Sequence, residues 1–145
     1  MNDSLTIAVK FWERTADESV AFHKRGDDAV KFYIGAGTAL AAWLLTQGEN
    51  PPAGAFAVLA LGVFGAGHVS YYHNRGYKLM LRATRIAKEI AKLAEVPSTI
   101  EAWSDDDKLR VTSLLTPGHP VTQILFNALV TLAIHLIYAL VLIYV

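Results

Sequence analysis

The sequence predicts an all-α membrane protein whose chain crosses the bilayer three times. Hydrophobic residues make up 53% of the 145 residues and charged residues 18%, and the mean hydropathy is positive at +0.32. Three stretches hold no Asp, Glu, Lys or Arg: residues 32–48, 51–73 and 121–145. About 20 apolar residues cover the hydrocarbon core of a bilayer, so the second and third stretches are long enough to cross it.

The same composition excludes several classes of protein. Lys and Arg together number 13 and so do Asp and Glu, which is unlike the basic profile of a general nucleic-acid binder. The chain has no cysteine, which excludes a disulfide framework, a thiolate zinc site and a cysteine nucleophile. No glycine-rich phosphate loop, HExxH motif or pair of intramembrane aspartates is present, so we expect no enzyme, no cofactor and no metal. His68 and His135 are expected at different depths, which does not fit the two axial ligands of one haem.

Residues 1–28 are predicted to form a cytoplasmic amphipathic helix. Its apolar stripe recurs at helical spacing and comprises Leu5, Val9, Trp12, Ala16 and Val20. Such a helix could pack on another cytoplasmic helix or lie on the bilayer surface. The first is favoured because the polar face mixes acids and bases, whereas surface-lying helices are biased to Lys and Arg.

Residues 29–73 are predicted to form a transmembrane hairpin of two spans. The first span reaches full length if Ala29 and Val30 belong to it and Lys31 extends to the interface. Gly48, Pro51 and Pro52 interrupt the pattern and predict the connecting turn. Small residues follow one face of each span and are expected to pack the two helices or neighbouring subunits. They are Gly35, Thr38, Ala39 and Ala42 in the first span and Gly62, Gly65 and Ala66 in the second.

Residues 74–120 are predicted to be a cytoplasmic helical segment. Its long helix carries a heptad-like apolar seam of Leu79, Ala83, Ile86, Ile90 and Leu93. A basic face interrupted by Glu89 consists of Lys78, Arg82, Arg85 and Lys92. We interpret this face as solvated and placed beside anionic lipid headgroups. No aromatic residues interleave with it, so an RNA or nucleotide contact has no support.

Residues 121–145 are predicted to be the third transmembrane helix. Four polar side chains recur at intervals of four along about 18 Å of this helix: Gln123, Asn127, Thr131 and His135. Polar groups are costly in the bilayer centre and seldom face lipid. Two roles remain open, interhelical hydrogen bonding and the lining of a water-filled pore, and in a ring of subunits one face could serve both.

Basic residues predict the orientation. Five Lys and Arg residues occur up to Lys31 and eight between Arg75 and Arg110, whereas the hairpin loop has none and nothing basic follows the third span. Because Lys and Arg gather in cytoplasmic segments, we expect the N-terminus and residues 74–120 in the cytoplasm and the C-terminus outside it. The expected location is the cell inner membrane. The first 28 residues carry too many charges for a cleavable signal peptide.

Part of the chain resembles the RipA-type octameric membrane proteins. The following residues resemble the N-terminal part of that family's sequences: Glu13, Ala16-Asp17, Arg25, Ala29, Phe32-Tyr33 and Thr38-Ala39-Leu40. Tyr77, Glu89, Pro97 and Trp103 resemble the helix after that family's hairpin and the acidic-Trp pattern beyond it. The match covers roughly residues 13–103 and has departures. Lys24-Arg25 stands where the family has paired arginines, and Val30 where it often has asparagine.

The layout also resembles SLATT two-span effectors and the small membrane protein that accompanies RNA-targeting CRISPR systems. These resemblances imply a homo-oligomeric ring, of eight subunits in the RipA-type case, with a role in antiviral defence or stress. We therefore expect a ring-forming protein in contact with membrane lipids that encloses a channel or membrane-disrupting pore. One alternative is a non-conducting oligomeric anchor that recruits a soluble effector. A weaker alternative is a phage holin.

Overall fold

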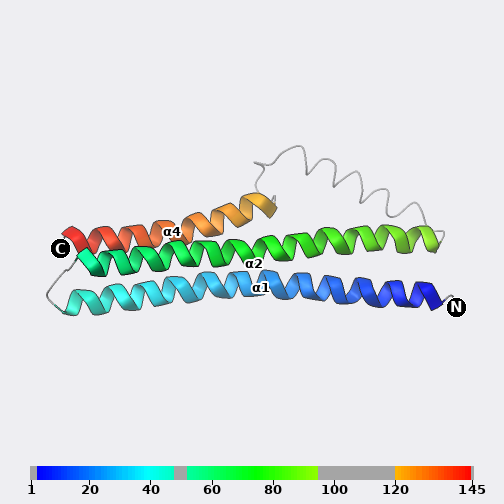
Figure 1. Cartoon of the computed structure of the whole chain (residues 1–145), viewed down its shortest axis with the longest axis horizontal. Coiled ribbons are helices and arrows are strands. Elements are labelled where there is room, and N and C mark those ends of the chain that lie inside the picture. The colour runs from blue at the N-terminus through cyan, green and yellow to red at the C-terminus, as the bar shows by residue number, and fades with distance from the viewer. Residues whose placement is uncertain (1–2, 48–51, 95–119, 145) are drawn as a thin grey trace. The chain divides into compact units, whose positions relative to one another are not determined.

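The part of the chain that the structure describes consists of three long α-helices. The computed structural model describes residues 3–47, 52–94 and 120–144. These form α1 (Asp3–Thr46), α2 (Pro52–Leu93) and α4 (Pro120–Tyr144), and the described residues contain no strand (Figure 1). All three helices are long and apolar enough to cross a membrane. The prediction of an all-α protein with three apolar spans is confirmed at this level.

Proline opens two of the helices. α2 begins at Pro52 and α4 begins at Pro120. Proline suits the first turn of a helix because its fixed φ is already helical and the amide hydrogen that it lacks would have no partner there. The sequence signal that predicted the start of the second span therefore marks the start of a helix in the structure.

α1 and α2 are each continuous across the boundaries that the sequence suggested. α1 joins the expected N-terminal amphipathic helix to the first span, and α2 joins the second span to the expected helix of the segment 74–120. Helical structure continues through Gly26 and Gly76, although glycine costs about 1 kcal/mol relative to alanine inside a helix. Contacts with neighbouring helices, described below, account for both glycines.

The chain divides into two compact units. Unit 1 consists of residues 1–23 and 74–123, and unit 2 consists of residues 24–73 and 124–145. The described residues of unit 1 come mainly from the first half of α1 and the second half of α2. Unit 2 combines the second half of α1, the first half of α2 and nearly all of α4.

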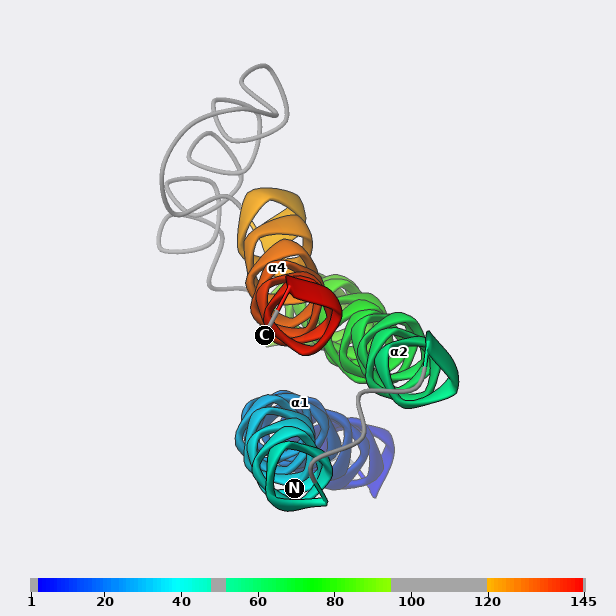
Figure 2. The ribbon, with the colours of Figure 1, turned by 90° about the vertical axis from the view of Figure 1, so that its left-hand side faces the viewer.

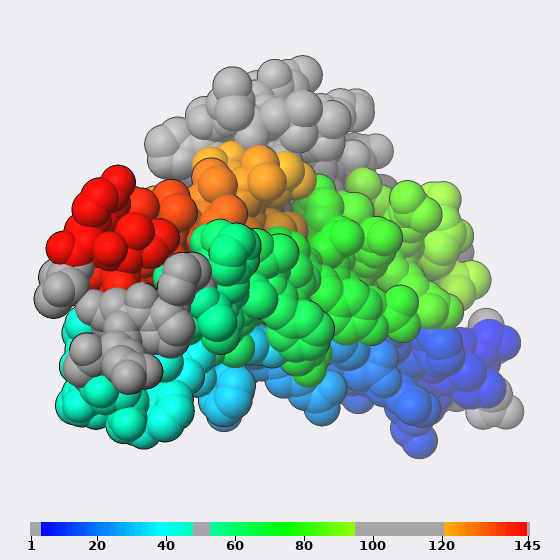
Figure 3. Space-filling model, turned by 60° about the vertical axis from the view of Figure 1, so that its left-hand side comes forward, coloured from blue at the N-terminus to red at the C-terminus, as the bar shows by residue number. Residues whose placement is uncertain are grey.

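Unit 2 is a three-helix bundle with its own apolar core. Figure 2 shows the ends of its three helices toward the viewer. A cluster of buried side chains joins all three, and comprises Ala41, Leu44, Ala55, Val58, Ala139 and Leu142. The last turns of α4 (red) lie against the beginning of α2 in the space-filling view (Figure 3). A second buried cluster of Ala29, Tyr33 and Val69 joins α1 to α2.

The outward surface of α4 is apolar. Large hydrophobic side chains that are at least 40% exposed recur along the helix: Leu125, Phe126, Leu129, Leu136, Ile137, Leu140, Val141 and Ile143. Such a helix is typical of one that faces lipid on one side and packs on the other. The polar residues of α4 lie mainly on the packed side.

Candidate functional site

Two glycines of unit 2 make room for one histidine ring. His135 of α4 is fully buried, and it packs against Gly37 of α1 and Gly62 of α2. A Cβ atom added at Gly37 would lie 2.4 Å from Nε2 of His135, and one added at Gly62 would lie 2.4 Å from its Cβ. Real Cβ atoms do not approach other atoms that closely. Glycine at both positions therefore lets α4 pack on α1 and α2 with an imidazole between them.

Three of the four polar residues predicted along the third span face this interior. Thr131 and His135 are both 0% exposed, and Asn127 is half-buried. The Thr131 hydroxyl donates to the carbonyl oxygen of Asn127 at 2.8 Å, and Nδ1 of His135 lies 2.7 Å from the carbonyl oxygen of Thr131. Gln123, the fourth, is exposed and belongs to unit 1.

The hydrogen bond of His135 assigns its tautomer. A carbonyl oxygen can only accept, so Nδ1 of His135 must carry the hydrogen of this bond. The other ring nitrogen, Nε2, is buried and has no hydrogen-bond partner among the described residues.

His73 joins the three helices of unit 2 at another level. His73 is 4% exposed, and its Nε2 lies 3.2 Å from the side-chain nitrogen Nδ2 of Asn127. Oδ1 of Asp27 lies 3.6 Å from the same Nε2 atom. A Cβ at Gly26 would lie 2.6 Å from Nε2 of His73. The side chains of α1, α2 and α4 thus meet at one imidazole. Sequence analysis did not find this cluster, since its members are far apart in the chain.

A similar contact occurs within unit 1. His23 of α1 packs on Gly76 of α2, where an added Cβ would lie 2.6 Å from its Nδ1. Ser19, buried one turn earlier, donates its hydroxyl to the carbonyl oxygen of Gly76 at 2.9 Å. The sequence carries a signal for both contacts: His-Lys-Arg-Gly at 23–26 and His-Asn-Arg-Gly at 73–76 repeat the pattern His-x-Arg-Gly.

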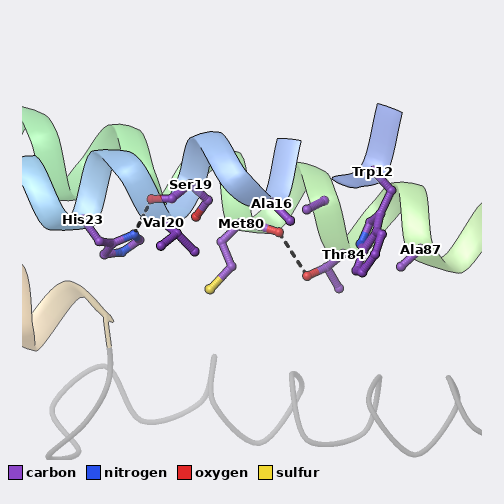
Figure 4. A pocket seen from close by; sticks show the side chains of 9 residues that line it. Trp12, Ala16, Ser19, Val20, His23, Met80, Thr84 and Ala87 are labelled. Atoms are coloured by element: carbon purple, nitrogen blue, oxygen red, sulfur yellow. Dashed lines mark hydrogen bonds between the residues drawn. The ribbon is translucent and has the colours of Figure 1, made fainter. Parts of the chain in front are cut away.

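The predicted seam of α2 faces α1 in part. Leu79 and Ala83 are buried, Ile86 and Ile90 are half-buried, and Leu93 is 58% exposed. Beside this seam, unit 1 has an apolar cavity of about 370 Å³, into which side chains of both helices point (Figure 4). Trp12, Val20 and Met80, which line it, remain 38%, 69% and 37% exposed.

The four residues of the predicted basic face are all exposed. They are Lys78, Arg82, Arg85 and Lys92. Cζ of Arg82 lies 5.5 Å from the ring centre of Phe11, and Lys92 Nζ donates to Glu89 Oε1 at 2.8 Å. The Arg82 guanidinium over an aromatic ring is a cation–π contact inside unit 1. The face otherwise presents its charge to the surroundings.

The small residues predicted to pack the hairpin divide into two groups. Gly62 and Gly65 of α2 are buried and Ala66 is half-buried, and a Cβ at Gly65 would lie 2.7 Å from Cγ of Tyr33. The four small residues of α1, Gly35, Thr38, Ala39 and Ala42, are exposed. Thr38 nevertheless shares a hydrogen bond of 2.8 Å with the Tyr138 hydroxyl. The close contact between α1 and His135 is made by Gly37, which is not one of the four predicted small residues.

The described part of the chain contains no group of three or more His, Asp or Glu residues that could hold a metal ion. The site is instead a set of interhelical contacts in which imidazole and phenol rings lie on glycines. No protein-family model, curated protein or solved structure matches the chain.

Proposed function

We propose that the protein is a self-associating, non-conducting membrane anchor. The burial of the α4 polar face carries this proposal. Thr131 and His135 make their hydrogen bonds inside one copy of the chain, and the large exposed side chains of α4 are apolar. A water-filled pore needs polar side chains directed toward water. Side chains packed inside their own bundle support anchoring more than conduction.

Features of unit 1 support association between copies. Its apolar cavity lies between α1 and α2, and three of the side chains that line it, Trp12, Val20 and Met80, are at least 37% exposed. The exposed charged residues of α1 in this unit are three acids and two bases, whereas those of α2 are five bases and Glu89. A head-to-tail arrangement would place the three acids of α1 against the basic face of α2 in the next copy, and repeated contacts of this kind form a ring where the rotation between copies closes. The proposed partner is therefore a second copy of this chain.

Dye release from vesicles tests the non-conducting half of the proposal. Purified protein is reconstituted into liposomes loaded with a small fluorescent dye. We expect release no faster than from empty liposomes, and the same result for Asn127→Leu and His135→Leu. Rapid release by the wild-type protein that Asn127→Leu abolishes would overturn the proposal and favour a pore.

The oligomeric half is tested in mild detergent by measuring particle mass. We expect a multiple of the 15.8 kDa chain mass for the wild-type protein. Replacing Val20 and Met80 together by Glu should dissociate it, because both side chains border the cavity and are partly exposed. Substituting exposed Ile7, outside that cavity, by Glu is the matched control. A monomeric wild-type protein would contradict the proposal.

The cytoplasmic location of the N-terminus, the inner membrane, a ring of eight and a role in antiviral defence or stress remain predictions from the sequence. A soluble effector as partner is a prediction of the same kind. Holin activity is distinguished by toxicity of the chain expressed alone, which an anchor does not cause.

A further inference from the structure

Unit 2 has a surface cavity between α1 and α2 that is more polar than the cavity of unit 1. This surface cavity of about 310 Å³ is lined chiefly by Arg25, Asp28, Phe32, Tyr33, His68 and Tyr72. It adjoins the beginning of the first apolar stretch of α1 and the end of the second stretch, on α2. If the two stretches cross a bilayer, as the proposed function requires, this level is that of the lipid headgroups.

We propose that this cavity binds the headgroup of a zwitterionic phospholipid with a primary ammonium, such as phosphatidylethanolamine. The inference rests on the membrane placement in the proposed function and adds a specific ligand to it. Three properties of the cavity carry it: one cation and one anion on a single helix face, an aromatic wall of Tyr33 on α1 with His68 and Tyr72 on α2, and exposed phenylalanines toward the apolar stretch.

The charges match a zwitterion. Arg25 and Asp28 are three residues apart on α1, which places them on one face. A guanidinium binds phosphate oxygens through paired N–H donors, and a carboxylate accepts the hydrogens of an ammonium group. Asp28 is accessible for this role, since its carboxyl is 59% exposed and lies 3.8 Å from Lys31 Nζ, beyond hydrogen-bond distance.

The aromatic wall is held by contacts between its members. The Tyr33 hydroxyl lies 2.9 Å from His68 Nδ1, and the rings of His68 and Tyr72 lie 4.6 Å apart at 36°. Ring faces attract cations within about 6 Å, which adds to the pull of Asp28 on an ammonium group. Tyrosine is also the residue that membrane proteins place at the headgroup level.

Apolar surface continues from the cavity toward the membrane core. Phe32 of α1 is 66% exposed and Phe64 of α2 is 67% exposed, and both rings lie edge to face with Tyr33 at 5.3 and 6.1 Å. These rings would contact the first methylenes of the acyl chains. A lipid is thus favoured over a soluble zwitterion, which would leave both phenylalanines uncovered.

The paired charges also discriminate among headgroups. Phosphatidylglycerol carries no ammonium group, so it adds no charge-assisted hydrogen bond to the Asp28 carboxylate, whose counter-charge remains the Lys31 ammonium at 3.8 Å. Phosphatidylcholine carries a quaternary ammonium, which has no hydrogen to donate to that carboxylate. The ethanolamine headgroup supplies both a phosphate for Arg25 and an N–H donor for Asp28.

Lipid binding to the full-length protein in detergent tests the proposal. Native mass spectrometry measures binding of three dihexanoyl lipids that differ only in headgroup: ethanolamine, glycerol and choline. We expect the ethanolamine lipid to bind at least about tenfold more tightly than the others. Arg25→Gln and Asp28→Asn should each weaken it about tenfold or more, the cost of about one charge-assisted hydrogen bond. Lys78→Gln, which removes an exposed charge of unit 1 that does not line the cavity, should bind as the wild type does.

Two further probes separate the sources of the signal. Soluble phosphoethanolamine and inorganic phosphate should bind at least about tenfold more weakly than the ethanolamine lipid. Equal binding of all three lipids, preference for the glycerol lipid, or wild-type binding by both Arg25→Gln and Asp28→Asn would overturn the proposal. Headgroup selectivity is independent of dye release. Loss of selectivity in a protein that releases no dye therefore refutes this site alone, and dye release by a selective protein refutes the anchor alone.

Discussion

Two histidines in the same local pattern have different surroundings in the two units. His23 in unit 1 and His73 in unit 2 each open a His-x-Arg-Gly sequence, and each packs on a glycine of the other long helix. His73 is 4% exposed and contacts Asn127 of α4, whereas His23 is half-buried and its Nδ1 lies 2.9 Å from the carbonyl oxygen of Ser19 in its own helix. The same motif therefore gives a deeply buried contact beneath α4 in unit 2 and a less deeply buried one in unit 1.

This comparison predicts the largest effect deep inside unit 2. Gly62→Ala places a Cβ 2.4 Å from Cβ and 2.7 Å from Cγ of His135, atoms that cannot move without α4. We expect a loss of about 3 kcal/mol in the free energy of unfolding, measured by thermal and denaturant unfolding in detergent. Gly67→Ala is the control, since nothing lies within 4 Å of its Cβ position and alanine favours the helix. Equal stability of the two variants would contradict the packing described here.

The two histidine–glycine contacts should respond differently to the same substitution. Gly26→Ala presses on His73, which Asn127 and its burial hold in place, so we expect a loss of about 2 kcal/mol. Gly76→Ala presses on His23, which is half-buried where His73 is buried, so we expect a smaller loss, and the gain in helix propensity offsets part of it. Unfolding of the two variants under one set of conditions measures the difference. A greater loss for Gly76→Ala would reverse the order that the burial predicts.

A smaller effect is expected for the hydroxyl that supports unit 1. Ser19→Ala removes the buried hydrogen bond to the carbonyl oxygen of Gly76, which should cost about 1 kcal/mol. Thr84→Ala is the comparison, because the Thr84 hydroxyl is exposed and bonds the carbonyl oxygen of Met80 within its own helix. Chemical denaturation distinguishes the two. A Ser19→Ala protein as stable as Thr84→Ala would show that the bond between helices contributes nothing.

The smallest effect concerns an exposed ion pair of unit 1. The side chains of Arg14 and Glu18 are 79% and 49% exposed, and Nε of Arg14 lies 3.4 Å from Oε1 of Glu18. Water and salt screen such a pair, so Glu18→Gln should change the free energy of unfolding by no more than a few tenths of a kcal/mol. A loss above about 1 kcal/mol at moderate salt would indicate that Glu18 has another role, such as contact with a second copy.

The apolar stretches made the helical fold predictable, because charge patterning reports which residues must avoid water. The prolines at 52 and 120 marked helix starts for a similarly local reason. The seam was predictable at Leu79 and Ala83, where heptad spacing alone selects the packed face. These features depend on residues within one or two turns of each other.

The contacts between helices were not predictable in the same way. Whether Gly37 or the neighbouring stripe from Gly35 to Ala42 receives a ring depends on the register of α1 against α4, which are about a hundred residues apart in sequence. The polar face of α4 was found from its spacing, but its direction toward the interior required the structure. The His-x-Arg-Gly repeat was visible in the sequence, and only the structure shows that each histidine packs on a glycine.

Accessibility of Thr131 to water tests the central claim most directly. The chain contains no cysteine, so Thr131→Cys introduces a single thiol that a charged, membrane-impermeant maleimide can report. The experiment uses open membrane fragments, where both faces are reached, with exposed Glu18→Cys as the positive control. We expect no labelling of Thr131→Cys in the time that fully labels Glu18→Cys. Labelling of both at similar rates would show that the α4 polar face meets water and would contradict the non-conducting anchor.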